Sequence, residues 1–302
     1  MKKWLLILLM LTLVGCRQEE KTIIIAEQYG LAYAPIQVMK EKGFLNSKLE
    51  DHSIEWVKFG NTTAIREAMV ADRLDVGFLG IPPFIMGSDK GMDWRIFTGL
   101  SRAPLGLMGK ENITSLKDIQ SDERIALPQP GSIQHILLSM AAERELNDAT
   151  YFDDQLVTMK HPDGMQVLLT GNDIDYHFTS PPYLFEEKNQ GMTEIISGES
   201  CFGDDFTFIV GITTPDFYED EVAYQALNDA LSETLEFMRE YPEETMDILE
   251  NYYDFDRETL KTYVYDSGIV YETAVKGVET FVEFMYRNGY IEKQIEEKDL
   301  LW

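Results

Sequence analysis

The sequence is poor in cysteine and in basic residues. Its 302 residues include two cysteines, which allow at most one disulfide, so the fold must be stabilised by hydrophobic cores. Lysine and arginine total 26 against 53 acidic residues, which gives a formal net charge of −27 at pH 7. So acidic a surface repels nucleic acid and anionic lipid headgroups, and we therefore expect no nucleic-acid partner. After residue 14 no apolar run is long enough to predict a membrane-spanning helix.

The sequence also lacks the patterns of common catalytic and metal sites. None of its four histidines is paired with cysteine or glutamate at the spacing of metal ligands. No glycine loop for phosphate and no G-x-S-x-G elbow occurs. Cys201 has no histidine near it in the sequence to activate its thiol, and we predict that it is simply buried. We therefore expect no catalytic residues, no metal and no cofactor.

The N-terminus has the pattern of an export signal. Two lysines precede an apolar run over 4–14, which is too short for a permanent membrane helix and has the charge order of a secretory signal. The run ends in LVGC, which resembles the bacterial lipobox and predicts a lipid on Cys16; an ordinary signal peptide with an incidental cysteine is the alternative. We expect a lipoprotein signal peptide over 1–15 and a lipidated tether over 16–21. Removal of the two lysines makes the net charge −29.

One pattern occurs twice, a hundred residues apart. LDVGFLGIPPFI (74–85) and IDYHFTSPPYLF (174–185) both place a Pro-Pro pair after a short apolar strand. Each pair closes the third strand of a unit that reads strand, helix, strand, helix, strand. Such units predict parallel strands with crossover helices, and they bind ligands beyond the carboxyl ends of the strands. If the two edges face each other across a hinge, the Pro-Pro turns form opposite walls of one cleft.

Three further segments carry a resemblance to a known family. They are AEQYGLAYAPIQVMKEKGF (26–44), AIREAMVADRLDVGFLGIPP (64–83) and WRIFTGLSRAPLGLMG (94–109). In their sequence and order the chain resembles the substrate-binding proteins of bacterial ABC importers that serve nitrate, sulfonates, taurine and the pyrimidine precursor of thiamine. The resemblance implies an α/β chain with a type 2 periplasmic-binding-protein fold, in which two Rossmann-like lobes joined by a hinge close on a small-molecule ligand.

The resemblance also implies partners, a location and domain boundaries. We expect a monomer, anchored by its lipid to the outer face of the cell membrane, or periplasmic if the host has an outer membrane. It would deliver its ligand to an ABC permease driven by a cytoplasmic ATPase. Lobe one would comprise 22–102 plus 206–302, with the C-terminal helices packed on it, and lobe two would comprise 103–205.

Ten residues on the predicted loops are candidates for ligand binding. They are Tyr29, Tyr33, Asn61, Thr62, Thr63, Gly80, Ser132, Thr179, Ser180 and Arg102. The Asn, Thr and Ser side chains are equally typical of helix N-caps, and the tyrosines of packing between lobes. Arg102, Lys58 and Lys160 could meet an anionic ligand or equally be surface residues, whereas Glu27 and Asp163 would favour a cationic ligand or merely complement a helix dipole. The ligand's charge therefore stays open, and we expect a small organic molecule with some planar or apolar surface.

Two other functions remain to be weighed. Some relatives of this fold are enzymes that act on a cleft-bound metabolite in menaquinone or thiamine routes, but these are cytoplasmic and the lipobox argues against them. The sensing module of a receptor needs a membrane helix after it, and the sequence has none after residue 14. A solute-binding protein that is not an enzyme is the function that the sequence favours.

Overall fold

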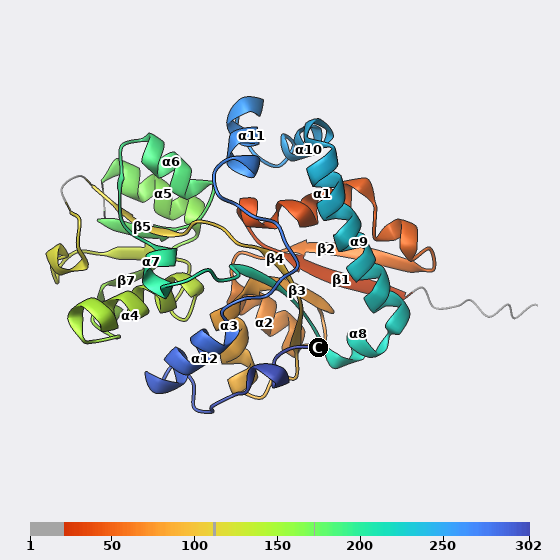
Figure 1. The fold of residues 1–302 in the computed structure, drawn as a ribbon, viewed down its shortest axis with the longest axis horizontal. Coiled ribbons are helices and arrows are strands. Elements are labelled where there is room, and N and C mark those ends of the chain that lie inside the picture. The colour runs from red at the N-terminus through yellow and green to blue at the C-terminus, as the bar shows by residue number, and fades with distance from the viewer. Residues whose placement is uncertain (1–20, 111–112, 172) are drawn as a thin grey trace, which may run out of the picture.

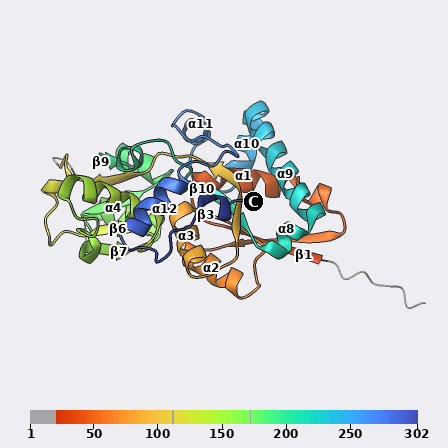
Figure 2. The same ribbon diagram turned by 60° about the horizontal axis from the view of Figure 1, so that its bottom comes forward.

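The structure is a computed structural model that describes residues 21–110, 113–171 and 173–302 (Figure 1). The predicted signal peptide and the lipidation of Cys16 therefore lie outside the described residues. Within the described ranges, no helix is long and apolar enough to pass through a lipid bilayer. Two bodies, each built on one sheet, lie side by side in both ribbon views (Figures 1 and 2).

The first body, called lobe one below, contains a five-stranded sheet in the order β2-β1-β3-β10-β4. Its strands are β1 (Lys21–Glu27), β2 (His52–Lys58), β3 (Val76–Gly80), β4 (Arg95–Ser101) and β10 (Ile209–Thr213). Its connecting helices are η1 (Leu31–Tyr33), α1 (Ala34–Lys42), η2 (Asn46–Lys48), α2 (Thr62–Val70) and α3 (Ile81–Asp89). Strands β1 to β3 are parallel, and β10 runs antiparallel between β3 and β4.

The second body, called lobe two, repeats this arrangement in the order β7-β6-β8-β5-β9. Its strands are β5 (Gly106–Gly109), β6 (Ile125–Leu127), β7 (Leu156–Thr158), β8 (Tyr176–Thr179) and β9 (Thr193–Ser197). Its helices are η3 (Leu116–Asp118), α4 (Ile133–Leu146), η4 (Asp153–Gln155), α5 (His161–Thr170), α6 (Tyr183–Asn189) and α7 (Gly198–Phe202). Strands β6, β7 and β8 are parallel and β5 is antiparallel to its neighbours, so both sheets are mixed. The predicted two-lobed α/β fold is confirmed, whereas the exact boundaries of the lobes stay a prediction.

Each of the two Pro-Pro pairs follows the third strand of its unit and leads into the next helix. Pro82 and Pro83 lie in the first turn of α3, where a missing backbone N–H leaves no hydrogen bond unmade. Pro182 is the N-cap of α6. Each pair therefore stops a strand and starts the next helix, because proline cannot continue a ladder but fits a helix start.

The C-terminal helices were expected on lobe one, and two of them contact lobe two as well. They are α8 (Pro215–Glu219), α9 (Glu221–Glu240), α10 (Pro242–Leu249), α11 (Arg257–Tyr265), α12 (Val278–Arg287) and η5 (Glu297–Asp299). Helices α9 and α10 pack on α1. In α11, however, the Tyr263 hydroxyl donates to Glu186 of α6 at 2.6 Å, and Arg287 of α12 donates to Glu143 of α4 at 2.6 Å. Helices α11 and α12 therefore connect both lobes, as their positions at the junction show (Figure 1).

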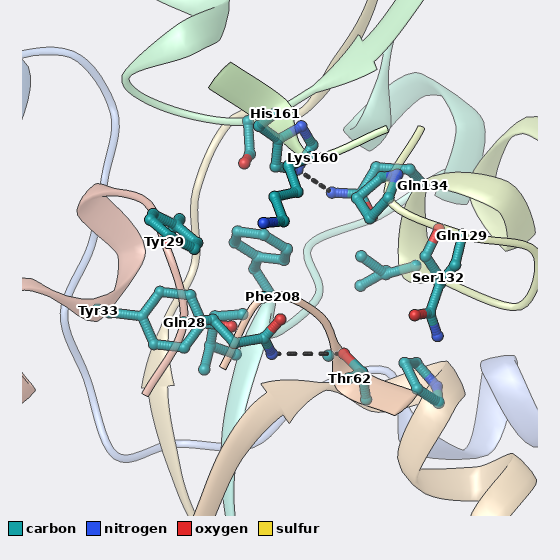
Figure 3. Close-up of a pocket in the computed structure, with 17 residues that line it drawn as sticks. Gln28, Tyr29, Tyr33, Thr62, Gln129, Ser132, Gln134, Lys160, His161 and Phe208 are labelled. Atoms are coloured by element: carbon teal, nitrogen blue, oxygen red, sulfur yellow. Dashed lines mark hydrogen bonds between the residues drawn. The ribbon is translucent and has the colours of Figure 1, made fainter. Parts of the chain in front are cut away.

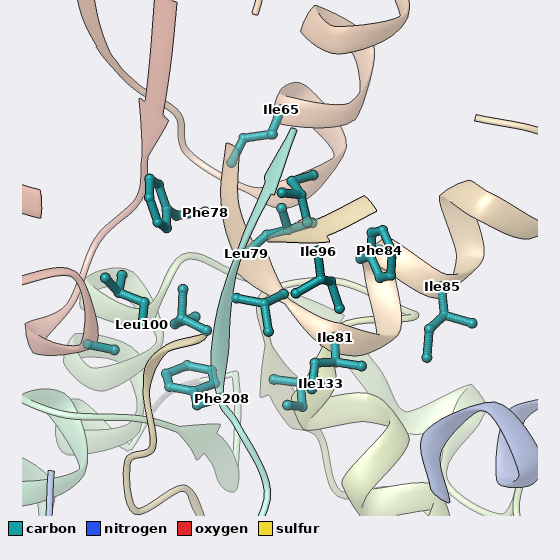
Figure 4. Close-up of a cluster of buried hydrophobic side chains, with 14 of the residues drawn as sticks. Ile65, Phe78, Leu79, Ile81, Phe84, Ile85, Ile96, Leu100, Ile133 and Phe208 are labelled. Carbon is teal, nitrogen blue, oxygen red and sulfur yellow. The ribbon is translucent and has the colours of Figure 1, made fainter. Parts of the chain in front are cut away.

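The largest hydrophobic core continues from one lobe into the other (Figure 4). Ile81 and Phe208 of lobe one belong to the same buried cluster as Ile133 at the start of α4. A Cβ atom added to Gly80 would lie 3.4 Å from Cβ of Ile133, which is ordinary van der Waals contact. The two lobes are therefore in direct contact through buried apolar side chains, as in a closed form.

Candidate functional site

A cavity of about 60 Å³ lies between the lobes, where the carboxyl ends of the parallel strands meet (Figure 3). It is lined by Gln28, Tyr29, Tyr33, Gly60, Thr62, Gly80, Pro83, Pro128, Gln129, Ser132, Ile133, Gln134, Lys160, His161, Ser180, Phe208 and Ile209. One water needs roughly 10–15 Å³ on this measure, so the space takes a molecule of only a few water-sized groups. Both lobes contribute, which places the cavity in the interlobe position that the sequence predicts.

Part of the predicted ligand set comes together in this lining. The residues concerned are Tyr29, Tyr33, Thr62, Gly80, Ser132 and Ser180. Ser132 is also the N-cap of α4, so its two possible roles, capping and lining, are combined. Their assignment to ligand binding remains a prediction.

Three other predicted polar residues are engaged outside the lining. Asn61 is the N-cap of α2 and accepts a hydrogen bond from a backbone N–H three residues on, at 3.0 Å. The Thr63 hydroxyl donates across the interface to Oε1 of Gln129 at 3.1 Å. Thr179 is fully buried, with its Oγ1 3.3 Å from Nδ1 of His161. In this arrangement Asn61 caps, Thr63 joins the lobes and Thr179 supports a residue of the lining.

The predicted cationic residues lie in different surroundings. Arg102 forms ion pairs with Glu272 and Asp205 where the chain crosses between the sheets, and it does not line the cavity. The Lys58 ammonium lies 4.2 Å from the centre of the Tyr29 ring. The acidic alternatives lie outside the lining too, since Glu27 is buried elsewhere and Asp163 is exposed.

Lys160 provides the one full positive charge in the lining. It is the N-cap residue of α5 on lobe two, yet its side chain reaches lobe one, because a Cβ atom on Gly60 would lie 3.2 Å from Cε of Lys160. Figure 3 shows its ammonium in the middle of the cavity. Among the described residues, no carboxylate lies within 4.0 Å of this ammonium and none belongs to the lining. The local charge is therefore positive in a protein that is strongly negative overall.

Three helices start at the cavity. Helix α2 begins at Thr62, α4 at Ile133 and α5 at His161, and all three residues line the cavity. The N-terminus of a helix carries about half a positive charge and unpaired backbone N–H groups. Three such ends around one small cavity form a site that favours an anion.

A chain of buried polar side chains leads from this lining into lobe two. His161 lies against His177 with Nδ1 and Nε2 3.1 Å apart, and Nδ1 of His177 lies 2.6 Å from Oε1 of Glu187. His177 and Glu187 are completely buried, and burial lowers the pKa of both imidazoles because it disfavours their charged form. Gly164 permits this contact, since a Cβ atom there would lie 2.8 Å from Nε2 of His177.

Several residues of the lining were not predicted from the sequence. Gln28, Gln129, Gln134 and Phe208 line the cavity, and none was a candidate. The one signal that the sequence offers for His161 is its position at the start of α5, shortly after the end of β7. Cys201 is buried, as predicted, and burial raises its pKa. Within the described ranges no cluster of three or more His, Cys, Asp and Glu side chains is arranged to hold a metal ion.

Known proteins of similar sequence and structure share this architecture. No family model matches the chain. A Bacillus subtilis (strain 168) protein named for binding aliphatic sulfonates is 25% identical over 325 residues, with 100% of this chain and 95% of that protein covered. The crystal structure of the periplasmic aliphatic sulphonate-binding protein of Escherichia coli is 19% identical, covers 93% of this chain and 92% of its own, and has a TM-score of 0.73.

A second crystal structure agrees with the first. The alkanesulfonate-binding protein of Xanthomonas axonopodis pv. citri, bound to MOPS, is 14% identical, covers 94% of this chain and 99% of its own, and has a TM-score of 0.79. In sequence and fold, this chain is similar to the solute-binding proteins of ABC importers. The type 2 periplasmic-binding-protein fold that the sequence predicted is confirmed, and the matched proteins are named as binding proteins rather than enzymes. The Escherichia coli protein, and a nitrate-binding protein of Synechocystis PCC 6803 that also matches in structure, are both named as periplasmic.

Proposed function

We propose that this chain is an extracytoplasmic solute-binding protein of an ABC importer that captures a small organic anion, and that a short aliphatic sulfonate is the class of ligand. The names of the matched binding proteins support a sulfonate. The single observation that carries the proposal is the lining itself, in which three helix N-termini and Lys160 meet with no carboxylate among the lining residues.

The acidity of the whole protein does not contradict an anionic ligand. Salt screens exposed charges beyond about 8 Å at physiological ionic strength, so the distant carboxylates act weakly inside the cavity. Lys160 is an exposed residue, but it and the helix ends belong to the lining and therefore lie much closer to a bound ligand than this screening length. The negative surface slows the approach of an anion more than it weakens the bound state.

The lining also has an apolar side for the organic part of the ligand. Tyr29 and Tyr33 belong to the first loop of lobe one, and Phe208 immediately precedes β10. Their rings can cover a short alkyl group, while Ser132 and Ser180 offer hydroxyls to the anionic end. The small cavity favours a ligand about the size of ethanesulfonate.

We further propose that the mature protein is a monomer held at the outer face of the membrane by a lipid on Cys16. The LVGC sequence after a secretory signal supports the anchor. An anchored binding protein stays close to the permease that receives its ligand, which raises its effective concentration there.

Calorimetric titration with ethanesulfonate tests the ligand class. We expect binding to the wild-type protein and, for Lys160→Met, an affinity lower by about 10-fold to 100-fold, the usual worth of a hydrogen bond to a charged group. Lys117→Met is the matched control, because Lys117 is an exposed lysine of lobe two outside the lining and its removal changes the net charge equally. Equal affinities for the two variants, or no binding of ethanesulfonate to the wild type, would contradict the proposal.

A further inference from the structure

A continuous row of hydrogen-bonding side chains connects the interior of lobe two with the cavity. It runs from Glu187 on α6 to His177 on β8, to His161 on α5 and to Gln134 on α4, with separations of 2.6, 3.1 and 3.2 Å. Only His161 and Gln134 of this row line the cavity (Figure 3). Ligand binding needs only these two, so the buried pair behind them requires a separate explanation.

The row can exist in two forms that differ by one proton. When the Glu187–His177 pair holds a proton between them, Nε2–H of His177 donates to Nδ1 of His161. His161 then carries its own hydrogen on Nε2 and donates it to Gln134, which must present its amide oxygen. When the pair has lost that proton, every bond reverses: Nδ1–H of His161 donates to Nε2 of His177, and Nε2 of His161 accepts from the amide NH₂ of Gln134.

The second form corresponds to the amide orientation of the structure, in which Nε2 of Gln134 faces Nε2 of His161. The oxygen and nitrogen of an amide have nearly the same shape, so a half-turn of the Gln134 amide converts one form into the other. The proton on the buried pair therefore decides which end of the amide is left free for a ligand.

The surroundings of Glu187 favour the form that keeps the proton. Its Oε2 atom is buried and has no hydrogen-bond partner among the described residues, which is costly for an ionised carboxylate. Apolar side chains such as Met108 and Leu184 lie in the core beneath α6 and β8. Burial raises the pKa of Glu187 to about 9, because the charged form is poorly solvated there.

We propose that Glu187 and His177 are positioning residues that turn the Gln134 amide so that its NH₂ group is free to donate to the ligand. The proposal rests on the anionic ligand proposed above, since an NH₂ group favours an anion and the amide oxygen disfavours it. Loss of the shared proton at alkaline pH reverses the row and offers the oxygen instead. The specificity of the cavity is thus set partly by two residues that never touch the ligand.

Other titratable groups near the row must be controlled for. They are Lys160 and Asp163 on α5, Tyr183, Glu186 and Lys188 on α6, Tyr176 on β8, His135 on α4 and Tyr29 across the cavity. Strands β5 and β6 carry no titratable side chain. Glu187→Gln leaves all of these groups in place and keeps a donor facing His177, so it isolates the shared proton.

Nitrogen-15 NMR of the histidines tests the row without any ligand. In the wild type we expect His161 to carry its hydrogen on Nε2 at pH 7 and on Nδ1 at pH 10. In Glu187→Gln the amide mimics the protonated carboxyl, so we expect the hydrogen on Nε2 at both pH values. The same tautomer in the wild type at both pH values, or the same change in the variant, would overturn the proposal.

Affinity for ethanesulfonate at pH 7 and pH 10 tests the consequence for binding. We expect the wild-type affinity to fall about 10-fold more than that of Glu187→Gln, the worth of one hydrogen bond. If the affinities of the wild type and of Glu187→Gln fall equally while the NMR change is present, the Gln134 amide is not a ligand donor, and the positioning role is overturned. If ethanesulfonate does not bind at all, the proposed ligand class is wrong. The NMR experiment still tests whether the proton on the Glu187–His177 pair sets the tautomer of His161.

Discussion

Replacement of Glu187 by glutamine should change how the stability of the folded protein depends on pH. In the folded state the Glu187–His177 pair holds one proton, because burial raises the pKa of the carboxyl to about 9 and lowers that of the imidazole. In the unfolded chain the two groups have ordinary pKa values of 4.5 and 6.5. Between these values the unfolded pair also holds one proton, so the pair gives no pH dependence there.

Above pH 6.5 the unfolded pair loses its proton and the folded pair keeps it. The free energy of unfolding then falls by about 1.4 kcal/mol per pH unit. From pH 6.5 to pH 9 the wild type should lose about 3 kcal/mol through this pair, on the order of a third of the stability of a typical domain. Glu187→Gln carries no such proton and should not show this loss. Below pH 4.5 the unfolded pair binds a second proton, and the wild type should again lose stability.

Urea unfolding between pH 5.5 and pH 9 measures this difference. Glu199→Gln is the matched control, since Glu199 is exposed at the start of α7 and its replacement removes the same charge. We expect the control to follow the wild type and Glu187→Gln to diverge from both above pH 6.5. Parallel stability curves for all three proteins would show that the buried pair does not retain a proton, and would refute the reasoning.

Three further predictions concern closure and anchoring. Gly30→Ala should destabilise the closed form by about 1–3 kcal/mol, because Gly30 has φ of 113° and a Cβ atom there would lie 3.0 Å from the carbonyl oxygen of Pro181. Small-angle scattering with saturating ethanesulfonate should therefore show a larger radius of gyration for the variant than for the wild type. An equal radius would contradict this prediction. Thr63→Val removes a hydrogen bond between the lobes and should weaken ethanesulfonate binding about 2-fold to 10-fold by calorimetry, whereas an unchanged affinity would show that closure does not use the bond. Cys16→Ser should move the native protein from the membrane fraction to the soluble fraction of its own host, and a soluble wild type would contradict the lipid anchor.

The architecture could be predicted from the sequence because its signals are local. Strands β3 (Val76–Gly80) and β8 (Tyr176–Thr179) are short apolar runs, each followed by a Pro-Pro pair that stops it, and no distant contact is needed to recognise them. Loops after such strands gather at one edge of a sheet, so Tyr33 and Ser180 could be placed at a cleft from topology alone.

The parts that could not be predicted depend on contacts between distant residues. Arg102 was a candidate for an anionic ligand, but its partner Glu272 is 170 residues away, and the sequence does not show such a pairing. Residues His161, His177 and Glu187 lie on three different elements, and only the packing of α5 and α6 on β8 brings them together. The spread of α11 and α12 over both lobes has the same cause, since its contacts join segments far apart in the chain.

A crystal structure of the protein with 2-bromoethanesulfonate tests the central claim most directly, because anomalous scattering from bromine locates the ligand. We expect one bound molecule between the lobes, with sulfonate oxygens within hydrogen-bonding distance of the Lys160 ammonium and of the backbone at the starts of α2 and α4. The bromine should lie toward Tyr29, Tyr33 and Phe208. Bromine bound elsewhere, or a ligand that contacts one lobe alone, would contradict the claim that this cavity captures a small organic anion.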